Sequence, residues 1–315
     1  MTPERIDIVI VHYNTSALLR GCLRSLRDCT VPHQVIVVDN ASTDRGVEAL
    51  AHEFPEVHFL FNAENRGYAA ANNQGIRSLA STGEPGRSAG SGTGILLLNP
   101  DAVVQPGALE TLVAFLQAHP RTGAAGPRLL NPDGSLQENA FAFPTLWMSF
   151  FDFFPLHGRL VRSRLNGRFR AMHGDQPFPI DHPLGACLLL RWEALQEVGL
   201  LDEGYFMYVE EVDLCYRLKQ AGWEVWHVPA ARVVHYGGQS TRQLPDRMFV
   251  ELHRSRFRFF HQHYGPAFRF LHRQITRLGL RWRARQDCQA CAAGRLTAAE
   301  AEARLAAYRQ IAEMR

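Results

Sequence analysis

The first hundred residues alternate between short apolar runs and longer segments in which apolar residues recur at helical spacing. Such an alternation is typical of β-α-β units on a parallel sheet. Strands are expected at 6–11, 35–38, 57–61 and 94–98, and helices at 17–26 and 68–79. Because strands that are buried on both faces read as continuous apolar runs, IDIVIV, VIVV and GILLL are expected in the middle of a sheet covered by helices.

The alternation is less regular after residue 100. Residues 81–93 are rich in glycine and serine and are expected to form a flexible loop. A segment at 141–170 mixes aromatic residues with arginines, which would suit either a surface for an amphiphilic partner or a filled core. Helices are further expected at 107–119, from 192 and at 210–221, and strands at 186–190, 224–228 and 232–235.

The composition is that of a folded chain. With 315 residues, 46% of them hydrophobic and 21% charged, it can bury one large core or two modest ones. No window approaches the roughly 18 to 20 apolar residues of a membrane-spanning helix, and the N-terminus lacks a signal-peptide pattern, so a cytoplasmic protein is expected. The six cysteines are expected to be reduced, and Cys288 and Cys291 fit helix-surface thiols better than a zinc site, because no second ligand pair accompanies them.

Polar side chains follow three of the apolar strands. IDIVIV runs into His12-Tyr13-Asn14, VIVV into Asp39-Asn40-Ala41-Ser42-Thr43-Asp44, and GILLL into Asn99-Pro100-Asp101. Each turn alone could be an ordinary strand end or helix cap. Because ligands bind at the C-terminal edge of a parallel sheet, three such turns in succession indicate a binding site at that edge.

The chain has neither a G-x-G-x-x-G turn nor a G-x-x-x-x-G-K-[ST] loop, so any phosphate must be held by another device. A divalent cation such as Mg²⁺ or Mn²⁺ is the natural substitute, and Asp101 could supply oxygen ligands to it. His235, which precedes two glycines, is either structural or a further ligand.

A second acidic group, Glu210-Glu211-Val212-Asp213, opens a predicted helix. Acidic residues in a first turn are favoured by the helix dipole, and this alone would explain one or two of them. They follow the apolar run 205–209, which would wall a pocket and raise the pKa of a carboxyl group. A catalytic base in this group is therefore plausible.

The motifs in combination resemble a known family. In order along the chain they are YN after the first strand, VVDNASTD, NRGYAAANNQGI, LLLNPDA, GACLLLRWEAL, GLLDEGYFMYVEEVDLCYRLKQAGW and HYGGQST. Over residues 5 to 265 the chain is similar to the inverting nucleotide-sugar glycosyltransferases of family 2, especially their bacterial rhamnosyltransferase-like branch.

The resemblance implies a GT-A fold, which is an α/β fold with a Rossmann-like, mostly parallel sheet and helices on both faces. Residues 1–240 would form the glycosyltransferase domain, with a nucleotide-sugar half at 1–105 and an acceptor half at 106–240. Residues 241–315 would form a basic, helical C-terminal extension.

The resemblance also implies roles for individual residues. Asp39 would bind the pyrimidine edge, and Asp101 would hold Mg²⁺ or Mn²⁺ on the diphosphate with help from His235. The donor side would be lined by Tyr13, Asn14, Asn65, Arg66, Asn73 and Asn99.

The family's Glu-Asp pair, whose Asp is the general base, falls on Glu210 and Glu211. Because Glu211 is one methylene longer than Asp, both Glu211 and Asp213 stand as candidates for the base.

The implied reaction moves a sugar from a dTDP or UDP donor to a saccharide, with dTDP-rhamnose the first expectation and a lipid-linked acceptor in cell-surface polysaccharide synthesis. One alternative is a nucleotidyltransferase that makes nucleotide sugars, but HYNTSALL is not the glycine-rich basic loop that such enzymes carry. The other is a non-catalytic nucleotide-sugar-binding module, which Glu211 in place of Asp keeps open.

The C-terminal region is basic, with eleven arginines against two acidic residues from 242 to 285, in a chain of net charge +3. At helical spacing an apolar stripe and an arginine ridge lie nearly opposite each other. The stripe is Phe268, Leu271, Ile275, Leu278 and Trp282, and the ridge is Arg269, Arg273, Arg277 and Arg281. Such a helix would either lie on anionic lipid, at the inner face of the cell membrane, or dock its stripe on the rest of the protein.

Two further expectations concern partners and the C-terminal end. No nucleic acid partner is expected, because the arginines accompany no recognisable reading motif. Residues 297–314 begin with a capping box and predict a plain helix with a structural or oligomeric role.

Overall fold

The computed structural model describes residues 5–79, 94–238 and 245–314, so the predicted loop at 81–93 lies outside the described residues. The chain divides into two compact units. Unit 1 comprises Met1–Phe141, Ala171–Phe206 and Glu210–Ser240, and unit 2 comprises Ala142–Arg170, Met207–Val209 and Thr241–Arg315.

Unit 1 is built on one sheet, in which ten strands are found among the described residues. Its order is β3-β2-β1-β4-β11-β6-β12-β5, with β7 added to β6 and β9 to β12. The first four strands in this order are parallel neighbours, as are β6 and β12, whereas β11 runs antiparallel to both β4 and β6. The strands are β1 (Ile6–His12), β2 (His33–Asp39), β3 (His58–Phe61), β4 (Gly94–Leu98), β5 (Ala102–Val104), β6 (Thr122–Leu130), β7 (Leu136–Gln137), β9 (Phe178–Pro179), β11 (Cys187–Arg191) and β12 (Glu224–His235). Separately, β8 (Ala140–Phe141) pairs with β10 (His182–Pro183).

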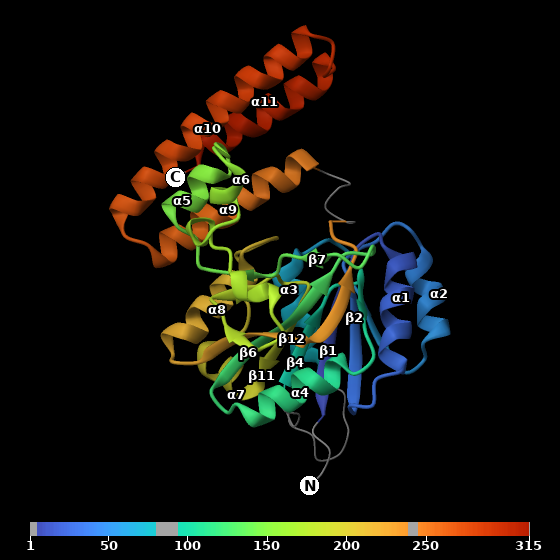
Figure 1. Ribbon diagram of the computed structural model, residues 1–315. Coiled ribbons are helices and arrows are strands. Elements are labelled where there is room, and N and C mark those ends of the chain that lie inside the picture. Colours follow the sequence, from blue (N-terminus) through green and yellow to red (C-terminus); the bar gives the residue numbers. More distant parts are fainter. Residues whose placement is uncertain (1–4, 80–93, 239–244, 315) are drawn as a thin grey trace. The chain divides into compact units, whose positions relative to one another are not determined.

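Helices cover both faces of this sheet (Figure 1). They are α1 (Ser16–Arg27), α2 (Gly46–Glu53), α3 (Tyr68–Ser78), α4 (Ala108–Ala118), α7 (Trp192–Val198) and α8 (Glu210–Gln220). The main core lies between the sheet and α1, α2 and α4. On the other face α3 packs closely on β1, because Gly75 leaves room there for the side chain of Val9.

The predicted strands and helices of the first hundred residues are found within about two residues of their expected bounds. One prediction after residue 100 is wrong: 224–228 and 232–235 belong to a single strand, β12. Its register against β6 shifts between Val228 and Arg232, a stretch that includes Pro229. Because proline has no N–H to donate, the ladder is interrupted without ending the strand. Helix α2 and several strands, among them β5 and the central strand β6, were not predicted.

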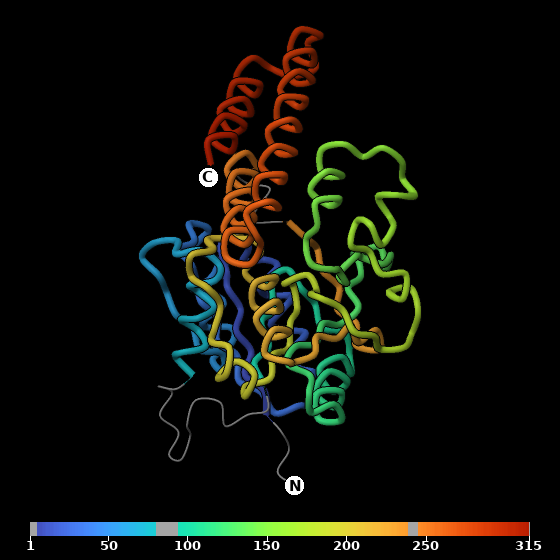
Figure 2. Tube along the Cα trace, turned by 90° about the vertical axis from the view of Figure 1, so that its left-hand side faces the viewer, coloured from blue at the N-terminus to red at the C-terminus, as the bar shows by residue number. Residues whose placement is uncertain are grey.

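Unit 2 is helical. It contains α5 (Leu146–Phe151), α6 (Gly158–Val161), the 3-10 helix η1 (Arg164–Asn166), α9 (Pro245–His263), α10 (Pro266–Ala292) and α11 (Ala298–Glu313). Figure 2 shows α10 and α11 as two long helices packed side by side. Thr297 caps α11 in the predicted capping box with Glu300, which confirms that expectation.

The segment expected at 141–170 has both buried and exposed apolar side chains. Phe151 and Phe153 are buried, and Phe153 packs against the backbone of α10 at Gly279, where a Cβ would lie 2.1 Å from its ring. In contrast, Trp147, Leu156 and Leu165 are exposed. Part of the segment therefore fills the core of unit 2, and part forms an apolar surface.

The buried face of α10 differs in part from the apolar stripe that was predicted from helical spacing. Its buried face is formed by His272, Thr276, Gly279 and Leu280. Most of the predicted apolar stripe is exposed, because the buried face is rotated away from it. Of the predicted arginine ridge, Arg273 Nη2 donates to the Met314 carbonyl (2.8 Å) and Arg277 Nε to the Ala312 carbonyl (3.3 Å). Both arginines therefore cap the C-terminal end of α11, where the helix dipole favours positive charge.

Charge and apolar surface are distributed unequally between the units. Unit 2 contains 20 arginines and seven acidic residues, which leaves 14 basic and 24 acidic residues for unit 1. Among the described residues, eight of the ten exposed large apolar side chains belong to unit 2. Within the described ranges, no helix has the length and apolar character needed to cross a membrane.

Candidate active site

The ends of β1 and β2 meet around a buried acid. Asp39 is 4% exposed and accepts a hydrogen bond from His12 Nδ1 at 2.8 Å and another from the Ser42 backbone N–H at 3.2 Å. Burial raises the pKa of Asp39, but the hydrogen bonds from His12 and Ser42 outweigh it, so that the pKa lies below its usual value. Since His12 Nε2 accepts from the Thr15 N–H (3.1 Å), the imidazole donates to Asp39 from Nδ1. Asp39 is therefore a fixed carboxylate at the edge of the sheet.

The neighbouring turns carry four of the other predicted donor residues. Asn14 lies in the left-handed region (φ 52°), and its side-chain oxygen accepts from the Thr43 N–H at 2.7 Å, which ties the turn that holds Tyr13 to the turn after Asp39. Asn65 and Arg66 are exposed and are bound to the same edge by Asn40, whose side chain donates to Asn65 Oδ1 (2.8 Å) and accepts from the Arg66 N–H (3.0 Å).

Asn73 is placed differently from the other predicted donor residues. It is 1% exposed, and its amide donates to the Leu201 carbonyl (2.8 Å) and to Glu203 (3.0 Å) while accepting from the Leu201 N–H (3.2 Å). All of its polar atoms are used to hold the 201–203 segment against α3. Its position supports a structural role.

Asp101 and His235 lie together, at the ends of β4 and β12. His235 Nε2 is 3.3 Å from Asp101 Oδ1, and both side chains are buried. On the other side of the ring, Nδ1 donates to Gln137 Oε1 at 2.7 Å, and Gln137 Nε2 donates in turn to Asn131 (3.0 Å) and to the His235 carbonyl (3.3 Å). Because Gln137 presents its oxygen to Nδ1, the proton resides there and the lone pair of Nε2 faces Asp101.

This pair has the chemistry and spacing of a partial metal site. Two ligands at right angles on an ion with bonds of about 2.1 Å would be about 3.0 Å apart. Among the described residues, no group of three or more His, Cys, Asp or Glu side chains is arranged to hold a metal. Since Mg²⁺ is commonly held by one or two protein ligands together with substrate phosphates, the Asp101–His235 pair fits a metal that is shared with a phosphorylated ligand.

Tyr68 connects the Asp101–His235 pair to the acidic group on α8. Its hydroxyl contacts Asn99 Oδ1 (3.0 Å) and the Gly185 carbonyl (3.2 Å), and Asn99 Nδ2 lies 3.5 Å from His235 Nε2. Burial raises the pKa of Tyr68 far above its usual value, and the nearby Glu210, Glu211 and Asp101 add to this effect. The phenol therefore stays protonated, with three acids around it.

The three acids on α8 differ in environment. Glu210 is 4% exposed, and burial together with the neighbouring Glu211 raises its pKa well above the usual value. Asp213 is buried in an ion pair with Arg217 (Oδ2–Nε 2.8 Å). Glu211 is more accessible than either, and it lies against Gly185, where a Cβ would be 3.4 Å from its Cγ.

The backbone before these acids is unusual. Tyr208 (φ 68°) and Val209 (φ 69°) both adopt the left-handed conformation, although neither is glycine. Such residues cost about 1 to 3 kcal/mol each and are concentrated at functional sites. Nearby, Gly67 (φ 85°) is required, because a Cβ there would lie 2.5 Å from the Phe206 carbonyl oxygen.

Three residues of this arrangement were not assigned a role from the sequence: His12, Tyr68 and Gln137. His12 could have been noticed, because it directly follows a buried strand at the same edge as Asp39. Tyr68 and Gln137 had no such signal, since one opens a helix and the other lies in a two-residue strand. The arrangement as a whole brings together a fixed carboxylate and the Asp101–His235 pair at the edge of the sheet and a half-buried glutamate on α8.

Comparisons with known proteins identify the family of this chain. The family model for glycosyl transferase family 2 matches residues 7–198. N-acetylglucosaminyl-diphospho-decaprenol L-rhamnosyltransferase of Mycobacterium tuberculosis is 34% identical over 263 residues, which cover 81% of this chain and 83% of that protein. The low-salt glycan biosynthesis hexosyltransferase Agl10 of Haloferax volcanii is 26% identical over 234 residues, covering 74% of this chain and 67% of that protein.

The fold is also similar to that of solved glycosyltransferases. A mannosyltransferase from Pyrobaculum calidifontis in complex with GDP-Man and Mn²⁺ aligns with a TM-score of 0.56 at 18% identity, covering 100% of this chain and 84% of that chain. The family expected from the motifs and the GT-A fold are thus both confirmed. The chain belongs to glycosyltransferase family 2 and is a rhamnosyltransferase-like enzyme of that family.

Proposed function

We propose that this glycosyltransferase moves a sugar from a nucleotide diphosphate to a lipid-linked saccharide, with inversion at the anomeric carbon. Rhamnose from dTDP-rhamnose is the first donor to test, because the Mycobacterium tuberculosis relative is an L-rhamnosyltransferase with a lipid-linked acceptor by name. The observation that carries the proposal is the position of Tyr68, whose hydroxyl contacts Asn99, beside the Asp101–His235 pair, and the carbonyl of Gly185, against which Glu211 lies. Such a transfer would belong to cell-surface polysaccharide synthesis.

Glu211 serves as the general base. Its carboxylate takes the proton of the acceptor hydroxyl while the acceptor oxygen bonds to the anomeric carbon, and the bond from that carbon to the diphosphate breaks. Attack from the face opposite the leaving group inverts the anomeric centre. Asp213 is the weaker candidate because its carboxylate is committed to Arg217, and a protonated Glu210 avoids two adjacent negative charges.

The donor binds at the opposite end of the same edge. Asp39, held by His12, accepts a hydrogen bond from the imide N–H of uracil or thymine, and Tyr13, Asn14, Asn65 and Arg66 surround the nucleoside diphosphate. Asp101 and His235 would hold Mg²⁺ or Mn²⁺ on the diphosphate, with Gln137 orienting the imidazole and Asn99 lying beside it on the donor side. When bound, the ion neutralises charge on the departing diphosphate.

Unit 2 provides a peripheral contact with anionic lipid. On α10 the exposed fractions of Leu271 (47%), Leu278 (56%) and Trp282 (39%) are large, and the three lie within about 20° of one line along the helix. Arg281 and Arg285 are exposed beside this line. An exposed apolar stripe flanked by arginines is the pattern of a helix that lies in the membrane interface.

The direct test incubates the purified chain and Mn²⁺ with dTDP-rhamnose, UDP-glucose or GDP-mannose, together with N-acetylglucosamine linked through a diphosphate to a short prenyl chain. We expect a rhamnosylated product of inverted anomeric configuration, detected by mass spectrometry and NMR. The product should be lost in EDTA and in Asp101→Ala.

Two other results would contradict the proposal. Pyrophosphate release from a nucleoside triphosphate and a sugar phosphate would indicate a nucleotidyltransferase. Saturable binding of a nucleotide sugar without turnover of any acceptor would indicate a binding module.

A further inference from the structure

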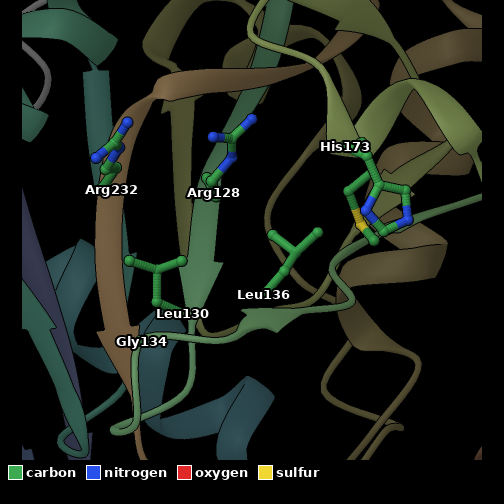
Figure 3. Close-up of a pocket in the computed structure, with 7 residues that line it drawn as sticks. Arg128, Leu130, Gly134, Leu136, His173 and Arg232 are labelled. Carbon is green, nitrogen blue, oxygen red and sulfur yellow. The ribbon is translucent and has the colours of Figure 1, made fainter.

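A pocket lies in unit 1, on β6 and β12, and none of the residues that line it belongs to the site described above. Its volume is about 340 Å³, within the range of small-ligand sites. Figure 3 shows Arg128 and Arg232 on neighbouring strands, with their guanidinium groups turned to the same side and His173 across from them. His173 ends the 3-10 helix η2 (Arg170–His173).

The pocket carries an excess of positive charge. Arg128 and Arg232 are direct register partners on two parallel strands, and like charges placed opposite each other are destabilising. Arg128 is fixed by Asp175 (Nη1–Oδ1 3.2 Å) and by the Gly174 carbonyl, and its own side chain is only 12% exposed. Within the described ranges, the Arg232 side chain has no ion pair or hydrogen bond. Of the two guanidinium groups, only that of Arg128 is therefore paired with a carboxylate among the described residues.

The remaining walls are apolar. Leu130, Leu136 and Met172 line the pocket beside the arginines. Behind Arg128, the ring of His227 is fully buried, and both of its nitrogens lack a hydrogen-bond partner among the described residues. Burial first, and then the charge of Arg128, lower the pKa of His227 to about 4, so this ring adds no charge to the pocket. The pocket thus offers two cationic hydrogen-bond donors next to an apolar surface.

Its position relates it to the acceptor side of the active site. Arg232 lies three residues before His235 on β12, about 10 Å along the strand, and because side chains alternate along a strand the two point to opposite faces of the sheet. The relation to the acceptor side is therefore made through β6, on the face to which Arg128 points. On β6, Gly126 lies two residues before Arg128 and packs on Pro183, in the segment that leads to Gly185 and Glu211.

We infer that this pocket binds the diphosphate of a prenyl-diphosphate-linked acceptor, with Arg232 and Arg128 on the phosphates and Leu130, Leu136 and Met172 against the first prenyl unit. A phosphate group is matched by guanidinium donors, and the prenyl carbon next to it is matched by the apolar wall. This assignment rests on the proposed function, because it supplies the substrate class of the same active site. It makes Arg232 a determinant of acceptor specificity.

Arg232→Gln is the variant of choice, since Arg232 is exposed and its side chain holds no other part of the described structure. Arg121→Gln is the matched control, because it removes the same charge from a side chain that is 76% exposed and outside the pocket. Farnesyl diphosphate binding, measured by calorimetry, should weaken by about tenfold or more in Arg232→Gln and remain unchanged in Arg121→Gln.

The kinetic arm compares two acceptors of the same sugar, one linked to a prenyl diphosphate and the other to a neutral alkyl chain. In Arg232→Gln we expect KM to rise about tenfold or more for the diphosphate acceptor only, with KM for the donor unchanged. A rise in the donor KM would assign the pocket to the donor diphosphate and overturn the inference. Equal farnesyl diphosphate binding by wild type and Arg232→Gln would overturn it as well. If the chain transfers no sugar at all, the proposed function fails, but the calorimetry still decides whether the pocket binds a prenyl diphosphate.

Discussion

The two units of this chain treat polar and apolar residues in opposite ways. Unit 1 has more acidic than basic residues, and its key polar groups, among them Asp39, Asp101 and Glu210, are buried at one edge of a sheet. Unit 2 has almost three arginines for every acidic residue and leaves Trp147, Leu278 and other large apolar side chains exposed. The contrast teaches that, under the proposed function, the chemistry belongs to unit 1 and the contact with lipid to unit 2. This division can be tested by changing one unit and measuring both transfer and lipid binding.

The largest effect is expected in unit 1, at Glu211. Glu211→Gln removes the basic oxygen at almost constant shape and should lower kcat by about 10² to 10⁴, with little change in donor affinity. Asp213→Asn should lower kcat less, because that residue supports Arg217. Steady-state kinetics with the soluble short-chain acceptor decides between them. If Glu211→Gln kept the kcat of wild type while Asp213→Asn was inactive, the base would be Asp213.

The next effect concerns attachment and should leave the chemistry intact. Replacing Leu271, Leu278 and Trp282 with serine should lower partitioning onto vesicles of anionic phospholipid by about 100-fold, since each side chain loses a large part of its apolar transfer energy. The kcat with a water-soluble acceptor should stay within about twofold. Phe61→Ser, which removes an exposed apolar residue from unit 1, is the control and should not change partitioning. Equal partitioning of wild type and the triple variant would show that the apolar stripe of α10 does not bind lipid.

A third test uses the acid sensitivity of unit 2. His272 is 1% exposed, and burial followed by the charge of Arg256 lowers its pKa to about 3. Because the folded state keeps this histidine neutral, its contribution to the free energy of unfolding is complete above the unfolded pKa of about 6.5. As the pH falls from there towards 3, the unfolded state binds a proton that the folded state does not, and the contribution is lost. At pH 5 the loss is about 2 kcal/mol. Urea unfolding at pH 7 and pH 5 should therefore show a smaller pH dependence for His272→Gln than for wild type; parallel losses would contradict this account.

The smallest effect is expected from Gln137, which orients a proposed metal ligand. Gln137→Ala should raise the Mn²⁺ concentration needed for half-maximal activity by about tenfold, because outer partners of metal-bound histidines typically matter at that level. Gln137→Glu keeps an acceptor for the Nδ1 proton and should remain close to wild type. If Gln137→Ala and Gln137→Glu need the same Mn²⁺ concentration for half-maximal activity, the acceptor oxygen of Gln137 does not position His235.

Much of unit 1 could be predicted because its signals are local. The buried strands IDIVIV and GILLL are short apolar runs that end in polar turns, and the chain order of those turns follows the family. The residue types made His235 only one possible further ligand beside Asp101, and the resemblance was needed to favour the pair, because the two lie 134 positions apart in the chain.

What could not be predicted depends on contacts distant in sequence. The wheel of α10 gave an apolar stripe, but packing at Gly279 and the capping of α11 by Arg273 and Arg277 decide which side is buried. Likewise, periodicity divided β12 into two strands, because an irregularity at Pro229 looks like an end when the partner strand is unknown. The burial of Asn73 against Leu201 is of the same kind.

The left-handed backbone at Tyr208 and Val209 also bears on how this enzyme can evolve. A β-branched residue in that conformation opposes folding, so selection for stability alone would favour glycine or asparagine at Val209. Stability gained in this way at functional sites is commonly accompanied by lost activity. Selection for thermal stability and the proposed catalytic role of Glu211 would therefore act in opposite directions on the two residues before Glu210.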